Sequence, residues 1–187
     1  MGNHTSQLQE EEIAEIQAET GFSSNQIERL YSRFTSLDKG DAGSLSREDF
    51  MRIPELAINP LGELIINSFF PENSDTVNFR QFLRILAHFR PITKSKEEGL
   101  NSREQKLQFA FNMYDQDHDG YISKDELLSI LQMMVGGYIS GEQLSCVAER
   151  TIFEADSDND QRISFEEFCN VLAKTDVEKK MSIRFLG

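Results

Sequence analysis

Two twelve-residue segments in the second half of the chain place carboxylates at the same four positions. In segment 115–126, aspartates stand at positions 1, 3 and 5 and a glutamate at position 12, and segment 156–167 repeats the pattern. Carboxylates at this spacing can surround one divalent cation. A bidentate glutamate at position 12 favours calcium over magnesium, because calcium accepts more oxygen ligands at a more flexible geometry. The two segments therefore predict two calcium-binding loops, named here loop three and loop four.

Each loop supplies a complete set of predicted oxygen ligands. In loop three these are the side chains of Asp115, Asp117, Asp119 and Glu126, the carbonyl of Tyr121 and a water held by Ser123. In loop four they are the side chains of Asp156, Asp158, Asp160 and Glu167, with the Arg162 carbonyl and Ser164. His118 occupies position 4, which is not a ligand position, and is expected to face solvent.

The turn position differs between the two loops. Gly120 stands at position 6 of loop three and Gln161 at position 6 of loop four. A residue with a side chain costs on the order of 1 kcal/mol or more at positive φ, compared with glycine. We therefore expect loop four to bind calcium more weakly than loop three.

The first half of the chain contains two degraded copies of the same unit. Segment 38–49 (loop one) keeps an aspartate at position 1 but has Gly40 and Ala42 at positions 3 and 5, while segment 70–81 (loop two) begins with Phe70 and ends with Gln81. Neither should bind metal. The residues at position 8 of the four loops are branched aliphatics, suited to short antiparallel pairing between neighbouring loops: Leu45, Val77, Ile122 and Ile163.

Apolar residues at helical spacing flank every loop, which predicts an all-α fold of four EF-hand helix-loop-helix units in two paired lobes, with short two-stranded β pairings between loops. Ser-x-x-Gln patterns predict helix starts at Ser6, Ser23, Ser102 and Ser140. The expected organisation is a leader and helix over 1–22, a lobe with two degenerate units over 23–90, a linker over 91–102, a calcium-binding lobe over 103–175 and a tail over 176–187.

Composition narrows the function. The chain has 19 basic and 32 acidic residues, a net charge of −13, which makes nucleic acid an unsuitable partner. Cys146 and Cys169 fall within helical patterns and are expected to be reduced, intracellular thiols. We expect no enzymatic activity, since no Cys/His or Ser/His/Asp set can be assembled, and no apolar run approaches the roughly 20 residues that span a bilayer.

The first six residues, MGNHTS, fit the pattern for N-myristoylation at Gly2, although a pattern this short also arises by chance. One myristoyl chain gives only marginal membrane binding, with an association constant of about 10⁴ M⁻¹. Anionic lipid does not attract a protein this acidic, so we expect a membrane-resident partner to supply the second contact.

From Glu19 to Leu186 the chain resembles the calcineurin B homologous proteins, relatives of the regulatory subunit of the calcium-dependent phosphatase. The resemblance lies in the strings ETGFS, RLYSRFTSLDKG, PELAINPLGE, AHFRPI, LNSR, MMVG and EKKMSIRFL. It implies four helix-loop-helix units with calcium in the third and fourth only. It also implies a subunit that binds a juxtamembrane cytoplasmic helix of a plasma-membrane sodium/proton exchanger and supports pH regulation, so that the protein is cytoplasmic and peripheral at the plasma membrane.

Two other functions stay open: a regulator or inhibitor of a calcium-dependent phosphatase that binds the calcineurin catalytic subunit, and a soluble calcium buffer. Fourteen phenylalanines and six methionines suit either a target groove or the core, and Met133 and Met134 are candidate groove residues. The tail has spaced apolar residues that suit a lid, a packing element or a nuclear export signal: Val177, Met181, Ile183, Phe185 and Leu186.

Overall fold

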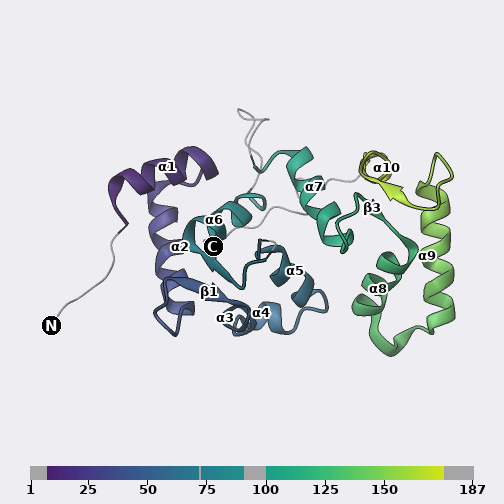
Figure 1. Cartoon of the computed structure of the whole chain (residues 1–187), viewed down its shortest axis with the longest axis horizontal. Coiled ribbons are helices and arrows are strands. Elements are labelled where there is room, and N and C mark those ends of the chain that lie inside the picture. Colours follow the sequence, from purple (N-terminus) through teal and green to yellow (C-terminus); the bar gives the residue numbers. More distant parts are fainter. Residues whose placement is uncertain (1–7, 72, 91–99, 175–187) are drawn as a thin grey trace.

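The computed structural model describes residues 8–71, 73–90 and 100–174. Gly2, Ser6, most of the predicted linker and the tail 176–187 lie outside the described residues. Within them the chain is mainly helical, with two short antiparallel sheets, as the sequence predicts. Two lobes lie side by side, with α1 to α6 forming one and α7 to α10 the other (Figure 1).

The first lobe holds both degraded loops. Its elements are α1 (Glu10–Thr20), α2 (Ser24–Leu37), β1 (Ser44–Ser46), α3 (Arg47–Met51), α4 (Pro54–Ala57), α5 (Gly62–Ser68), β2 (Thr76–Asn78) and α6 (Phe79–Ala87). Strand β1 pairs with β2, which places Leu45 opposite Val77, and both side chains are fully buried. The phenyl rings of Phe34, Phe50 and Phe82 belong to one apolar core together with Leu45 and Val77.

The second lobe holds both acidic loops. Its elements are α7 (Arg103–Tyr114), β3 (Tyr121–Ile122), α8 (Lys124–Val135), the 3-10 turn η1 (Gly136–Tyr138), α9 (Gly141–Ala155), β4 (Ile163–Ser164) and α10 (Phe165–Val171). The predicted pairing of Ile122 with Ile163 is confirmed by the register of β3 and β4. These two isoleucines belong to a second core with Phe111 and Ile152, separate from the first.

Three predicted helix starts are confirmed. Ser23 and Ser140 close capping boxes with the glutamines three residues later, and the hydroxyl of Ser102 accepts the amide of Gln105. The start predicted at Ser6 is wrong, because α1 begins at Glu10 with Gln9 as its N-cap. Gln9 forms its own capping box with Glu12, so the first carboxylate-rich turn sets the boundary in place of the serine.

Ion pairs attach the leader helix α1 to α6. Arg80 donates to Glu19 at 2.8 Å and to Glu15 at 3.0 Å, and Arg84 also pairs with Glu19. Burial raises the pKa of Glu19, but hydrogen bonds from Arg84 and Arg80 outweigh it and hold this pKa below its ordinary value. The carboxylate of Glu19 is therefore stabilised by its place between the two helices.

A chain of contacts joins the lobes. Arg90, just after α6, donates to the carbonyl of Thr20 at 2.8 Å, and its own carbonyl accepts the Lys106 ammonium of α7 at 2.8 Å. Lys106 has no exposed surface. The end of the predicted linker is also packed, since Leu100 lies against the first core and Asn101 is buried. These contacts fix the start of α7, from which loop three follows.

Candidate metal centres

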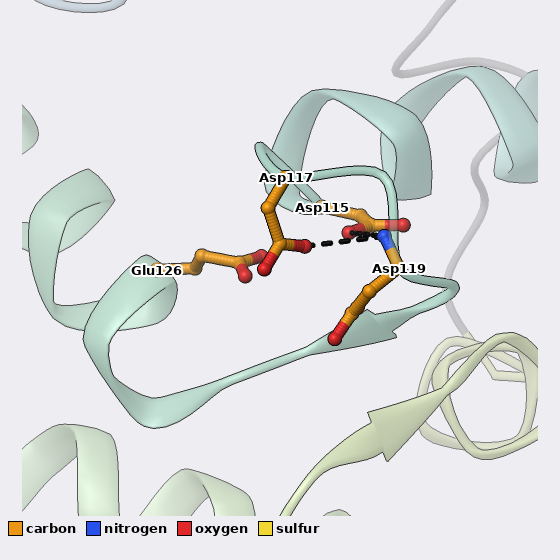
Figure 2. Close-up of side chains that lie close together, drawn as sticks. All are labelled: Asp115, Asp117, Asp119 and Glu126. Carbon is orange, nitrogen blue, oxygen red and sulfur yellow. Dashed lines mark hydrogen bonds between the residues drawn. The ribbon is translucent and has the colours of Figure 1, made fainter.

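Loop three gathers four carboxylates at the turn between α7 and α8. One oxygen from each of Asp115, Asp117, Asp119 and Glu126 lies within 4.8 Å of the others. Figure 2 shows Glu126 reaching from the first turn of α8 toward Asp117. The sequence prediction that these four residues converge is thus matched by the geometry.

Backbone amides shape this loop around the aspartates. Asp115 accepts the amide of Gly120 at 2.9 Å and that of Asp119 at 3.1 Å, and Asp119 accepts the amide of Tyr121 at 2.9 Å. Ser123 caps α8: its hydroxyl accepts the Glu126 amide at 3.2 Å and donates to the Glu126 carboxylate at 3.2 Å. The first turn of α8 therefore aims Glu126 into the loop.

The cluster fits calcium in donor type and size. All the gathered donors are carboxylate oxygens, the type that calcium prefers, and oxygens on opposite sides of a calcium ion lie about 5 Å apart. Burial raises the pKa of Asp115, and the neighbouring Asp117 carboxyl adds to the rise. Burial and the charges of Asp117 and Asp115 likewise raise the pKa of Glu126. Such mutual repulsion is what a divalent cation at this point relieves.

Loop four repeats the cluster between α9 and α10. Oxygens of Asp156, Asp158, Asp160 and Glu167 also lie within 4.8 Å of one another. The glutamates at position 12 differ in their surroundings. Burial tends to raise the pKa of Glu167, but hydrogen bonds from the amides of Ser164 (2.9 Å) and Ser157 (2.8 Å) hold that pKa below its ordinary value. Hydrogen bonds from the loop therefore outweigh burial at Glu167, whereas burial and the neighbouring carboxylates outweigh such hydrogen bonds at Glu126.

The turn residues have the predicted backbone. Gly120 has φ 87° and Gln161 has φ 66°, so glutamine occupies the left-handed region that glycine occupies in loop three. Position 4 is left-handed as well in every loop, a feature that the sequence prediction missed: Asp41, Asn73, His118 and Asn159. His118 is exposed, as expected for a residue that turns away from the ligand cluster.

Loop one keeps the scaffold but not the ligands. Asp38 accepts the amides of Ala42 at 3.1 Å and Gly43 at 2.7 Å, the same pattern that Asp115 makes in loop three. Asp49 at position 12 pairs with Arg52 at 2.9 Å. In loop two, Phe70 at position 1 packs on the ring of Phe50. Among the described residues, only loops three and four gather acidic side chains in a way that could hold a metal ion.

The remaining predicted contributors have visible side-chain contacts. The hydroxyls of Ser123 and Ser164 accept backbone amides as helix N-caps. The water that each serine is predicted to hold stays a prediction. The guanidinium of Arg162 lies 3.8 Å from the centre of the Tyr121 ring, a contact between the loops that the sequence did not indicate. The carbonyl ligation predicted for Tyr121 and Arg162 also stays a prediction.

Apolar side chains are exposed at both ends of the second lobe, near η1 and beside loop four. Met133 and Met134 of α8 are 38% and 50% exposed, Tyr138 of η1 is 97% exposed, and Phe153 of α9 is 81% exposed. Cys146 is exposed and makes no disulfide. Across the described parts of the chain, we find no helix with the length and apolar character needed to cross a bilayer.

Comparison with known proteins places the chain among EF-hand proteins. A family profile described as an EF-hand domain pair matches residues 104–173, the lobe that carries both acidic clusters. The calcineurin B subunit of Naegleria gruberi is 46% identical to this chain over 185 residues, which are 98% of this chain and 99% of that protein. The similarity to the Naegleria protein extends through both lobes, including the lobe whose loops lack ligands.

Proposed function

This chain belongs to the calcineurin B family of EF-hand proteins, and on that basis we propose that it is the calcium-binding regulatory subunit of a calcineurin-type phosphatase. The observation that carries the proposal is the identity of 46% with a calcineurin B protein along nearly all of both chains. Two complete carboxylate clusters support calcium binding. The role of the chain is regulatory, and the phosphatase reaction belongs to its partner.

The exposed apolar surface supports a helical partner. Met133 and Met134 project from the last turn of α8, and Tyr138 follows in η1. Methionines adapt to varied apolar surfaces and are favoured where an amphipathic helix is bound. In this proposal a helix of the calcineurin catalytic subunit covers these residues when calcium occupies loops three and four.

A sodium/proton exchanger helix is the second candidate partner. It would dock by the same chemistry, through its apolar face, and the sequence resemblance that favours it includes the strings MMVG and EKKMSIRFL. The comparison with the Naegleria protein supports the phosphatase reading better, because that relative is named as a part of calcineurin. The exchanger and its pH regulation therefore rank second.

The proposal includes a lipid on Gly2 and a cytoplasmic location at membranes. Its support is the N-terminal MGNHTS pattern. Intact mass of protein made in a eukaryotic host tests it: a myristoyl group on Gly2 is expected, and a free or acetylated terminus throughout would remove the lipid from the proposal.

Peptide capture tests the partner. Two helical peptides are immobilised, one from the calcineurin catalytic subunit and one from an exchanger juxtamembrane segment. Each is incubated with the unaltered chain, with Glu126→Ala and with the matched neighbour Asp125→Ala, and the amount of bound chain is measured. Asp125 is exposed at position 11 of loop three, so its variant removes a carboxylate without removing a predicted ligand. We expect calcium-dependent capture by the phosphatase helix, retained in Asp125→Ala and weakened in Glu126→Ala.

Other outcomes rank the alternatives. Stronger capture by the exchanger helix would favour that partner over the phosphatase. Capture by neither helix, together with no calcium-dependent binding of a dye that reports exposed apolar surface, would favour a soluble calcium buffer, since buffers barely open on binding metal.

A further inference from the structure

Arg162 is in contact with both calcium loops. Its guanidinium lies 3.3 Å from one carboxylate oxygen of Asp160, and its backbone amide donates to the other oxygen at 2.9 Å. The same guanidinium stacks over the ring of Tyr121 in loop three at 3.8 Å. Arg162 therefore engages both oxygens of a predicted loop-four ligand while its side chain rests on loop three.

Loop three has a different arrangement at the equivalent position. Asp119 accepts the amide of Tyr121 at 2.9 Å, and the residue that donates this amide carries a neutral ring where loop four has a cation. A cation beside a ligand carboxylate competes with a metal ion for its oxygen and repels that ion. Loop four is thus opposed by a charge that its counterpart in loop three lacks.

The β pairing explains why the guanidinium stays beside Asp160. Strand β3 lies antiparallel to β4, with Tyr121 opposite Ser164, so Arg162, two residues before Ser164, is the diagonal neighbour of Tyr121 on the same face of the pairing. Lys124 and Glu149 form a second tie between the start of α8 and α9. A guanidinium over an aromatic face is attracted to it, and only 42% of the Arg162 side chain is exposed.

We propose that Arg162 sets the order in which the loops take up calcium, loop three before loop four, because its guanidinium holds Asp160 and is itself held by the ring of Tyr121. The inference rests on calcium binding as proposed above and names Arg162 as a positioning residue that acts on the ligand Asp160. It does not depend on which partner the chain serves.

The effect of Arg162 on the calcium affinity of loop four is measured by calorimetry on a chain in which only loop four can bind calcium. Glu126→Gln disables loop three, and Arg162→Met is then compared with Arg150→Met in this background. Arg150 lies on α9, where its guanidinium pairs with Glu154, so its variant makes the same change in net charge away from the loops. We expect Arg162→Met to lower the Kd of loop four about two- to fivefold, as for loss of one exposed ion pair. An unchanged or higher Kd, or an equal fall in Arg150→Met, would overturn the proposal.

The aromatic ring is tested in the same background. Tyr121→Leu removes the ring and Tyr121→Phe keeps it. If the ring holds the guanidinium on Asp160, loop four binds calcium more tightly in the leucine variant than in the phenylalanine variant, and this difference disappears when Arg162→Met is also present. A difference that persists without Arg162 would show that the ring acts by another route and would overturn the stacking argument.

The order of filling is read directly in the unaltered chain. During a calcium titration followed by NMR, the amide of Gly120 should shift before that of Gln161, and in Arg162→Met the two should shift closer together. Simultaneous shifts in the unaltered chain would overturn the proposed order. Failure of the unaltered chain to bind calcium would refute the calcium function as well, whereas normal binding in the reverse order would refute only the role of Arg162.

Discussion

Replacing Gln161 with glycine should strengthen calcium binding by loop four. Gln161 has φ 66° and an exposed side chain. A residue with a side chain pays about 1–2 kcal/mol in the left-handed region, while glycine loses extra chain freedom worth about 0.4–1 kcal/mol when it is ordered. The difference favours glycine by about 0.5–1 kcal/mol, or roughly two- to fivefold in affinity. Loop ordering and metal binding are coupled, so the gain appears in the Kd.

The reciprocal change provides a matched comparison. Gly120 has φ 87° and no atom lies within 4 Å of where its Cβ would be, so Gly120→Gln adds backbone strain without a clash. It should weaken loop three by a similar factor. Calorimetry assigns each effect when the other loop is disabled by Glu126→Gln or Glu167→Gln. If Gln161→Gly leaves loop four unchanged, or if Gly120→Gln does not weaken loop three, turn strain adds nothing to the difference in calcium affinity between the two loops.

Two further changes test the packing around the lobes. Glu19→Gln should lower the free energy of unfolding by about 1 kcal/mol at pH 7, since it removes the charge that the arginines of α6 contact. The pKa of Glu19 is depressed in the fold, so the deficit should shrink as pH falls through and below its ordinary value of 4.5, when the unaltered side chain also becomes neutral. Urea unfolding across pH, with Glu28→Gln on α2 as control, measures this, and a deficit that persists at low pH would contradict it. Lys106→Met should cost about 1–3 kcal/mol, because the part-buried carbonyl of Arg90 loses the ammonium donor that the buried Lys106 side chain supplies. Thermal unfolding of Lys106→Met is compared with that of Lys39→Met, which replaces an exposed lysine. Equal melting temperatures for the two variants would refute this reasoning.

Local pattern was enough to predict the acidic clusters and the loop pairing. Spacing of aspartates within one loop determines which carboxylates can meet, and the position-8 residues carry the β pairing in both lobes. The turn geometry at Gln161 also followed from its position in the repeat. These features depend on residues close together in the sequence, or on a repeat that can be aligned with itself.

The left-handed backbone at position 4 was missed although the sequence carried a signal. The four loops place Asp, Asn, His and Asn there, the side-chain types most often found in this region outside glycine. The left-handed backbone at position 4 would have been found by aligning the four loops and asking, at each position, which residues tolerate positive φ as well as which can act as ligands.

Contacts between distant segments could not be predicted from pattern. The pairing of Glu19 with Arg80 joins residues 61 apart, and the contact of Arg90 with Thr20 joins residues 70 apart. The stack of Arg162 on Tyr121 depends on the sheet register and on two side-chain conformations. Such contacts are set by how helices pack, and the sequence marks only the charges available for them.

Calcium stoichiometry is the most direct test of the proposed sites. Equilibrium dialysis at micromolar calcium should find two ions bound to the unaltered chain and to the neighbour controls Asp125→Ala and Glu166→Ala, one ion in Glu126→Ala or Glu167→Ala, and none when both glutamates are replaced. No retained calcium in the unaltered chain, or two ions still bound after both replacements, would contradict the assignment of loops three and four as the metal centres.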